Sequence, residues 1–174
     1  FVDDGSTDNT NKLLHQYFKS KQNIKVKIVK HEKNKNLGAA LRTGFSNCNC
    51  EVICTMDSDC TYDPENLPIL LDAFYKSGAD IVTASPYHPK GGVENAPKYR
   101  IFLSNGVTLI YRIITGAKIY TFTSMYRVYK RSVIDSTKLY YNNFLAVTEL
   151  MIYPLFKKYR VVEVPMVLHS RQFG

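Results

Sequence analysis

The chain has 174 residues, of which 45% are hydrophobic, so it is long enough for one domain with a core and too apolar for a disordered chain. Its 23 Lys and Arg against 15 Asp and Glu give a net charge of +8, which indicates an anionic partner: nucleic acid, acidic lipid headgroups or a phosphorylated substrate. The longest stretch without a charged residue is 101–111, which is 11 residues against the roughly 20 that a membrane-spanning helix needs.

The cysteines and the chain ends add two expectations. The four cysteines lie within residues 48–60 and form no Cys-x-x-Cys pair, which predicts free thiols in a reducing compartment and no zinc site. No signal peptide is evident. Phe1-Val2 has the character of a strand end, so we expect a fragment of a longer protein that lacks the first strand of its domain.

The first 85 residues alternate strand and helix patterns. Residues 9–19 place apolar side chains at the 3–4 spacing of an amphipathic helix, and residues 52–56 form a continuous apolar run, typical of a buried parallel strand. Further strands are expected over 1–2, 24–29 and 79–84, and further helices over 37–45 and from Pro64 onward. Helices of about ten residues between strands imply a parallel sheet with right-handed crossovers.

The second half is less regular. The expected elements are a loop over 85–98, a helix over 99–114, a strand over 124–129, a helix over 144–158 with Pro154 as a potential kink, and a strand over 161–168. Ligands of parallel α/β sheets bind beyond the carboxyl ends of the strands, which is where two acidic turns of this chain fall.

The first of these acidic turns follows the strand over 52–56. Residues two apart in an extended chain point to the same side, so Asp57 and Asp59 are placed to bind one cation together. Carboxylate oxygens suit Mg²⁺ or Mn²⁺, which take one or two carboxylates and complete their shell with substrate phosphates. The alternative is a pair of solvated aspartates, but the strand before them and the helix start at Pro64 favour a ligand site.

The second acidic turn is Asp3-Asp4, followed by Gly5, which permits a tight turn. Carboxylates at this place are suited to bind ribose hydroxyls or the N–H of a base. The alternative is an Asx-type turn that caps the next helix, with Asp8 as the N-cap. The two interpretations are compatible, because Asp8 can cap the helix while Asp3 and Asp4 bind a ligand.

These motifs and their order resemble family 2 glycosyltransferases of the GT-A fold. Phe1–Asp8 (FVDDGSTD) is similar to the family's nucleotide-binding turn, Asn36–Gly44 (NLGAALRTG) to its glycine-containing helix, and Met56–Asp59 (MDSD) to its metal-binding segment. The stretches 85–93, 123–129 and 163–174 look like dolichol- or polyprenol-phosphate mannose and glucose synthases. The resemblance implies a single α/β domain with a Rossmann-like, mostly parallel sheet flanked by helices, a nucleotide-binding half over about 1–85 and an acceptor half over about 86–174.

The resemblance also implies the site residues. The implied catalytic residues are Asp59, Glu149 and Arg127; the donor-binding residues are Asp3, Asp4, Gly38, Asp57, Ser85 and Arg171; and the ligands of Mg²⁺ or Mn²⁺ are Asp57 and Asp59. Arg100 is a further candidate for phosphate binding, because it follows the Gly91-Gly92 loop. A surface or salt-bridge role is equally open for Arg100, Arg127 and Arg171.

Three positions depart from the synthase pattern. Pro86 stands where the synthases usually have arginine, Met125 where they have glycine, and Thr61 where a glutamine often helps to hold the metal. These departures leave the family intact and leave the sugar and the acceptor open.

The expected reaction moves a hexose with inversion from GDP-mannose or UDP-glucose to a polyprenyl or dolichyl phosphate. Such a phosphate is already an anion and attacks without a general base. The alternative acceptor is a hydroxyl of a cell-surface polysaccharide, which needs a base, and Glu149 is then the candidate.

The helix over 99–114 is apolar on more than one face, which indicates either core packing or an element that lies on a membrane surface. With the net charge of +8, we expect a protein that is peripheral at the cytoplasmic face of a membrane. Nucleic acid is not an expected partner, because no binding motif is present. A nucleic-acid-binding domain and a nucleotidyltransferase stay as remote alternatives.

Overall fold

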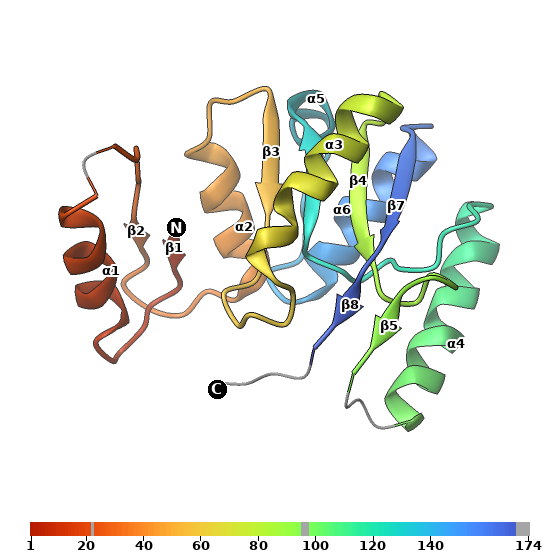
Figure 1. Cartoon of the computed structure of the whole chain (residues 1–174), viewed down its shortest axis with the longest axis horizontal. Helices are drawn as coiled ribbons and strands as arrows, with labels where there is room; N and C mark the ends of the chain where they lie inside the picture. The colour runs from red at the N-terminus through yellow and green to blue at the C-terminus, as the bar shows by residue number, and fades with distance from the viewer. Residues whose placement is uncertain (22, 95–97, 170–174) are drawn as a thin grey trace. The chain divides into compact units, whose positions relative to one another are not determined.

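A computed structural model describes residues 1–21, 23–94 and 98–169, and the chain forms two compact units (Figure 1). Unit 1 comprises Phe1–Asn49 and Leu139–Ala146, and unit 2 comprises Cys50–Lys138 and Val147–Gly174. This structural division differs from the predicted nucleotide-binding half (about 1–85) and acceptor half (about 86–174). Those halves were defined by function, and they stay a prediction.

Unit 1 combines a short parallel sheet with two helices. Its elements are β1 (Val2–Asp3), α1 (Thr10–Lys19), β2 (Val29–Lys30) and α2 (Leu37–Ser46). β1 and β2 are parallel neighbours, with Val2 opposite Val29. The strand expected over 24–29 is limited to Val29–Lys30, because β1 offers only two residues to pair with.

Unit 2 is built on a four-stranded sheet in the order β3-β6-β4-β7. Its strands are β3 (Val52–Thr55), β4 (Ile81–Ser85), β6 (Arg127–Lys130) and β7 (Val161–Pro165). β4 and β7 run parallel, whereas β6 runs antiparallel to both of its neighbours. Three of the five strand pairings among the described residues are parallel, which confirms an α/β fold with sheets rich in parallel pairs.

The prediction for residues 52–56 is wrong in one respect. β3 pairs only with β6 among the described strands, and it does so antiparallel, so it is an edge strand rather than a buried parallel one. Cys54 of β3 is exposed. A continuous apolar run shows that a strand is partly buried, but it contains no information on the direction of a partner that lies about 70 residues further along the chain.

Helices and a second small sheet complete unit 2. These elements are η1 (Pro64–Asn66), α3 (Leu67–Ser77), β5 (Gly92–Val93), α4 (Lys98–Thr115), α5 (Arg131–Ser136), α6 (Leu145–Phe156, whose first two residues belong to unit 1) and β8 (Val167–Leu168). β5 and β8 pair in parallel. Pro154 lies inside α6, as the sequence suggested.

The core of unit 2 lies between α3 and the sheet. Leu70 and Phe74 of α3 are buried in one cluster with Val82 of β4, Tyr126 and Val128. This cluster fixes the strands of the sheet, and therefore fixes the loops that follow their carboxyl ends.

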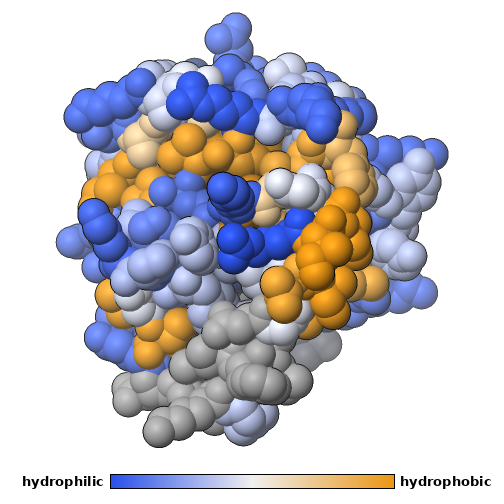
Figure 2. Space-filling view, turned by 90° about the vertical axis from the view of Figure 1, so that its right-hand side faces the viewer, coloured by the Kyte–Doolittle hydropathy of each residue, from blue (hydrophilic) through white to orange (hydrophobic). Residues whose placement is uncertain are grey.

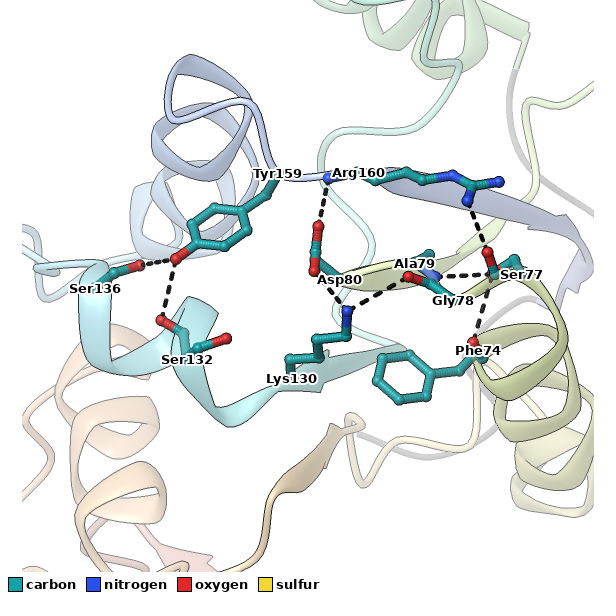
Figure 3. A network of polar contacts seen from close by, with 10 residues as sticks. All are labelled: Phe74, Ser77, Gly78, Ala79, Asp80, Lys130, Ser132, Ser136, Tyr159 and Arg160. Carbon is teal, nitrogen blue, oxygen red and sulfur yellow. Dashed lines mark hydrogen bonds and ion pairs between the residues drawn. The ribbon is translucent and has the colours of Figure 1, made fainter.

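At the amino end of β4, a polar network ties the strands to their connections (Figure 3). The Lys130 ammonium lies 2.8 Å from Asp80 Oδ1, and the Arg160 backbone N–H donates to Asp80 Oδ2 over 2.8 Å. Burial raises the pKa of the Asp80 carboxyl, but the hydrogen bonds from Lys130 and Arg160 outweigh it and hold the pKa below its ordinary value of 3.8. Asp80 thus serves the stability of unit 2, at the end of β4 that lies away from Ser85.

Candidate functional site

Unit 2 brings the carboxyl ends of two strands to one edge of its sheet. Thr55 of β3 and Thr83 of β4 are both paired with Arg127 of β6, so β3 and β4 point the same way, and β4 extends two residues beyond the level at which β3 ends. The Asp57-Ser58-Asp59 turn therefore leaves the sheet at the edge where Ser85 ends β4, as is usual for the ligand sites of α/β proteins.

Within that turn, the carboxylate of Asp59 has a fixed orientation. Its Oδ1 accepts hydrogen bonds from the Thr61 backbone N–H over 3.1 Å and from the Thr61 hydroxyl over 2.9 Å. The Thr61 carbonyl in turn accepts from the His169 backbone N–H over 2.9 Å. Thr61 thus holds the Asp59 carboxylate, a contact that sequence reasoning did not predict.

The donor set of this turn fits a divalent cation that is shared with a phosphate-bearing ligand. Asp57 and Asp59 are both half-buried, and both offer hard oxygen atoms. Residues 1–21, 23–94 and 98–169 contain no group of three or more His, Cys, Asp or Glu side chains that is arranged to hold a metal. Two carboxylates are the number that Mg²⁺ or Mn²⁺ takes from a protein when substrate phosphates complete the coordination.

In unit 1, the Asp3 carboxylate lies in the interior with only one oxygen satisfied. The side chain is 4% exposed, and Oδ1 accepts from the Ser6 backbone N–H over 2.8 Å. Hydrogen bonds from Ser6 hold the pKa of Asp3 below its ordinary value, so this carboxylate is ionised at neutral pH. The other oxygen, Oδ2, is buried and makes no hydrogen bond with the described residues.

The turn itself requires Gly5. Its φ of +78° lies in the left-handed region, and a Cβ at this position would come within 2.4 Å of the Lys33 carbonyl carbon. Asp8 accepts from the Thr10 backbone N–H over 2.9 Å, one residue ahead of the N-cap Asn9. The turn is therefore both an acidic site and the start of α1.

Asp4 is held by two partners. Its Oδ1 lies 2.5 Å from His31 Nδ1 and accepts from the Lys35 backbone N–H over 3.0 Å. The second ring nitrogen of His31 lies 2.8 Å from the Thr43 hydroxyl. Nothing in the sequence pattern assigns His31 a role, because a single histidine after a strand is more often a core residue.

Gly38 of α2 lies where another segment of unit 1 comes close to the helix. A Cβ at this position would lie 2.2 Å from the Tyr141 carbonyl oxygen and 2.8 Å from Ala146 Cβ. The Arg42 guanidinium, one turn further along α2, donates to the carbonyl oxygens of Leu139 and Tyr141. The structure thus supplies a packing reason for this glycine, and its predicted contact with the donor stays a prediction.

Arg127 lies in the interior of unit 2, with a relative exposure of 0%. Its guanidinium donates to the Val147 carbonyl over 2.9 Å, to the Phe122 carbonyl over 2.6 Å and to the Thr83 hydroxyl over 3.3 Å. These contacts give the buried guanidinium a structural role, and its predicted catalytic role stays a prediction.

Ser85 is also buried, and it belongs to a network around Glu163. The Ser85 hydroxyl lies 2.8 Å from both Glu163 Oε1 and the Thr121 hydroxyl. The Glu163 carboxylate also accepts from the backbone N–H groups of Tyr120 and Thr121, each over 2.9 Å. Ser85 therefore helps to hold the 120–121 segment next to β4 and β7, and its predicted donor contact stays a prediction.

The other predicted site residues lie as follows. Glu149 is buried in α6, with a relative exposure of 6%. Arg100 lies in α4, and Arg171 lies outside the described residues. Unit 1 contains Asp3, Asp4 and Gly38, and unit 2 contains Asp57, Asp59, Ser85, Arg127 and Glu149.

One face of α4 is apolar and exposed. On its inner side, the Tyr111 ring packs on the Phe122 ring with centroids 5.3 Å apart. Figure 2 views the side of the molecule on which α4 lies and shows hydrophobic residues gathered on that face. The exposed apolar residues of this helix include Val107, Leu109, Ile110, Ile113 and Ile114. No helix within residues 1–21, 23–94 and 98–169 combines the length and the apolarity that crossing a bilayer requires.

The sequence comparisons with known proteins agree with one another on the family. The model of the glycosyl transferase family 2 matches residues 1–137. The chain is 32% identical over 179 residues to a polyprenol monophosphomannose synthase of Mycolicibacterium smegmatis, with 99% of this chain and 67% of that protein aligned. It is 33% identical over 175 residues to a dolichol-phosphate mannosyltransferase of Pyrococcus furiosus, with 99% of this chain and 48% of that protein aligned. The chain thus spans about half to two thirds of the length of these relatives.

Solved structures confirm the fold. The glucosyl-3-phosphoglycerate synthase of Mycobacterium tuberculosis, in a complex with Mn²⁺, UDP-glucose and phosphoglyceric acid, superimposes with a TM-score of 0.71 at 15% sequence identity. The match covers 99% of this chain and 59% of that one. At this identity, the likeness establishes the GT-A arrangement of strands and helices that the sequence motifs predicted.

Proposed function

Because the chain belongs to glycosyl transferase family 2, we propose that it transfers a hexose from a nucleotide sugar to a polyprenyl or dolichyl phosphate, with inversion at the anomeric carbon. The observation that carries the proposal is the Asp57-Ser58-Asp59 turn at the carboxyl edge of the sheet, with Asp59 fixed by Thr61. The names of the relatives, which include a mannose synthase and a mannosyltransferase for polyprenol-type phosphates, support this choice of acceptor. GDP-mannose and UDP-glucose are the candidate donors.

We assign the nucleoside part of the donor to Asp3 and Asp4. Asp3 Oδ2 is buried and makes no hydrogen bond with the described residues, and both hydrogen bonds that Asp4 makes with them use Oδ1. Leaving a buried acceptor unsatisfied costs about 1–3 kcal/mol, which a hydroxyl or N–H of a ligand recovers. Ribose hydroxyls and base N–H groups are donors of this kind.

We assign the divalent ion, Mg²⁺ or Mn²⁺, to Asp57 and Asp59. When bound, the ion supplies a positive charge that stabilises the diphosphate leaving group as the sugar departs. The protein's own part is to offer two carboxylates from one turn and to fix Asp59 through the Thr61 hydroxyl. The structural neighbour solved with Mn²⁺ and UDP-glucose, which shares the fold, supports the choice of a divalent ion.

The acceptor decides whether a base is needed. A lipid phosphate attacks as an anion, so the buried Glu149 is not required for proton transfer. A polysaccharide hydroxyl would need a base, for which Glu149 was the sequence candidate. We favour the lipid phosphate, and we place the protein at the cytoplasmic face of a membrane through the exposed apolar residues of α4.

Calorimetric titration of the full-length protein with GDP and UDP, each with and without Mn²⁺, tests the proposal. We expect metal-dependent binding of one nucleotide, weakened at least about tenfold in Asp59→Asn, because one of the two carboxylates loses its charge. Asp72→Asn, which removes an exposed carboxylate of α3, is the matched control and is expected to bind as the wild type does. A folded wild-type protein that binds neither nucleotide would show that the acidic turns are structural and that the proposal is wrong.

A further inference from the structure

Three polar side chains of unit 1 form a chain of hydrogen bonds. Asp4 Oδ1 lies 2.5 Å from His31 Nδ1, and His31 Nε2 lies 2.8 Å from the Thr43 hydroxyl. Asp4 belongs to the turn after β1, His31 follows β2, and Thr43 lies in α2. His31 is 7% exposed, so the chain of bonds lies in the interior of the unit.

The chemistry of the three groups fixes the orientation of the imidazole. An ionised carboxylate only accepts, so His31 Nδ1 carries a proton and donates to Asp4. The Thr43 hydroxyl both donates and accepts, so it satisfies Nε2 whether or not that nitrogen is protonated. The ring is therefore held in one orientation in either charge state.

The consequence is a carboxylate that is fixed at one oxygen and open at the other. The Lys35 backbone N–H donates to the same Oδ1 over 3.0 Å, so both hydrogen bonds that Asp4 makes with the described residues use Oδ1. The Asp4 side chain is 20% exposed. Oδ2 is thus presented in a set direction to a ligand, which a freely rotating surface aspartate would not do.

We propose that His31 is a positioning residue for the nucleotide donor. It holds Asp4 so that Oδ2 accepts a hydrogen bond from the nucleoside, and Thr43 holds His31. The inference rests on the donor role that the proposed function gives to Asp4. There, Asp4 contacts the nucleoside, and the diphosphate belongs to the metal at Asp57 and Asp59; the inference adds His31 and Thr43 to the nucleoside contact.

Two replacements of His31 separate its two contacts. The amide nitrogen of asparagine takes about the place of Nδ1, so His31→Asn keeps a donor for Asp4. The amide of glutamine takes about the place of Nε2, so His31→Gln keeps a partner for Thr43 and loses the donor to Asp4. At the other end of the chain, Thr43→Val removes the hydroxyl at nearly constant size, and Thr43→Ser keeps it.

The test compares a nucleotide with inorganic pyrophosphate. In calorimetry on the full-length protein with Mn²⁺, we expect His31→Gln to weaken binding of the preferred nucleoside diphosphate about tenfold, the effect of losing one charge-assisted hydrogen bond. Pyrophosphate affinity is expected to stay within about twofold of the wild type, because it has no nucleoside. His31→Asn and Thr43→Ser are expected to bind close to the wild type, and Thr43→Val more weakly than Thr43→Ser. In turnover, KM for the donor rises in His31→Gln and kcat does not change.

Several outcomes would overturn the inference. It is wrong if His31→Gln binds the nucleotide as well as the wild type does, or if it loses affinity for the nucleotide and pyrophosphate equally. If circular dichroism shows that His31→Gln is unfolded, the nucleotide and pyrophosphate affinities of Thr43→Val and Thr43→Ser are compared instead. The inference is then wrong if Thr43→Val binds the nucleotide as well as Thr43→Ser does, or if it loses affinity for both ligands equally. A wild-type protein that binds no nucleotide overturns the proposed function itself, and the inference with it.

Discussion

A glycine is needed at position 38 because the 141–146 segment lies against α2 at that point. A methyl group there would be 2.2 Å from the Tyr141 carbonyl oxygen, which belongs to the backbone and does not move aside easily. Gly38→Ala gains about 1 kcal/mol of helix propensity but costs about 1–3 kcal/mol of overpacking. We expect a net loss of roughly 1 kcal/mol or more in the free energy of unfolding, measured by urea titration.

Gly44 of the same helix provides the control. Its Cβ would lie 3.6 Å from Val2 Cγ2, an ordinary van der Waals contact. Gly44→Ala is therefore expected to stabilise the protein by about 0.5–1 kcal/mol. Equal effects of the two substitutions would show that the close approach at Gly38 does not determine stability.

Arg127 illustrates why roles of single residues are harder to predict than motifs. In the sequence, an arginine within a stretch that resembles a synthase motif favours phosphate binding. In the fold, its donors go to the carbonyls of Phe122, just before this stretch, and of Val147, 20 residues further along the chain. A buried guanidinium needs such partners, and only the three-dimensional arrangement shows that they are carbonyl groups.

At the scale of the elements, the bounds of the expected helices lie within two residues of the observed ones, whereas α5 (Arg131–Ser136) and the strand pairing were not predicted. The helix expected over 99–114 is α4 (Lys98–Thr115), because its apolar periodicity is local information. The place of β6 between β3 and β4 depends on contacts between distant segments, which single-sequence patterns do not contain. The acidic turns were placed correctly at strand ends, because each follows its strand directly in the chain.

The exposed face of α4 makes a prediction about membranes. Ile113 is 74% exposed, and inserting such a side chain into a bilayer interface is worth about 1.5–3 kcal/mol. We expect the wild type to co-float with vesicles that contain anionic lipid. Ile113→Asp is expected to bind these vesicles at least about tenfold more weakly.

Ile69→Asp is the matched control for this experiment, because Ile69 is 53% exposed on a different helix, α3. It is expected to leave flotation unchanged. Absence of wild-type protein from the floating fraction, or equal effects of both substitutions, would show that the apolar face of α4 does not contact a membrane.

On the scale of the whole molecule, each unit contains a buried or half-buried carboxylate that is held in its charged form. Asp3 of unit 1 and Asp80 of unit 2 both have a pKa below the ordinary value of 3.8. A carboxyl with a lowered pKa in the folded state binds protons less readily than it does in the unfolded chain. Its contribution to stability is therefore complete above about pH 3.8 and is lost as the pH falls through the folded-state pKa, so both units are expected to weaken in the same acid range.

Asp80→Asn separates the part that belongs to unit 2. The substitution removes the charge that faces Lys130 while the amide oxygen keeps an acceptor for the Arg160 N–H. We expect a loss of roughly 1 kcal/mol in the free energy of unfolding at pH 7, falling toward zero at an acid pH below the folded-state pKa of Asp80, where the wild type has lost the same interaction. Since the chain contains no Trp, far-UV circular dichroism during urea titration at the two pH values is the suitable measurement. A loss that is the same at both pH values would mean that Asp80 acts through its shape and hydrogen bonds, and that the charge on Lys130 is stabilised by water instead.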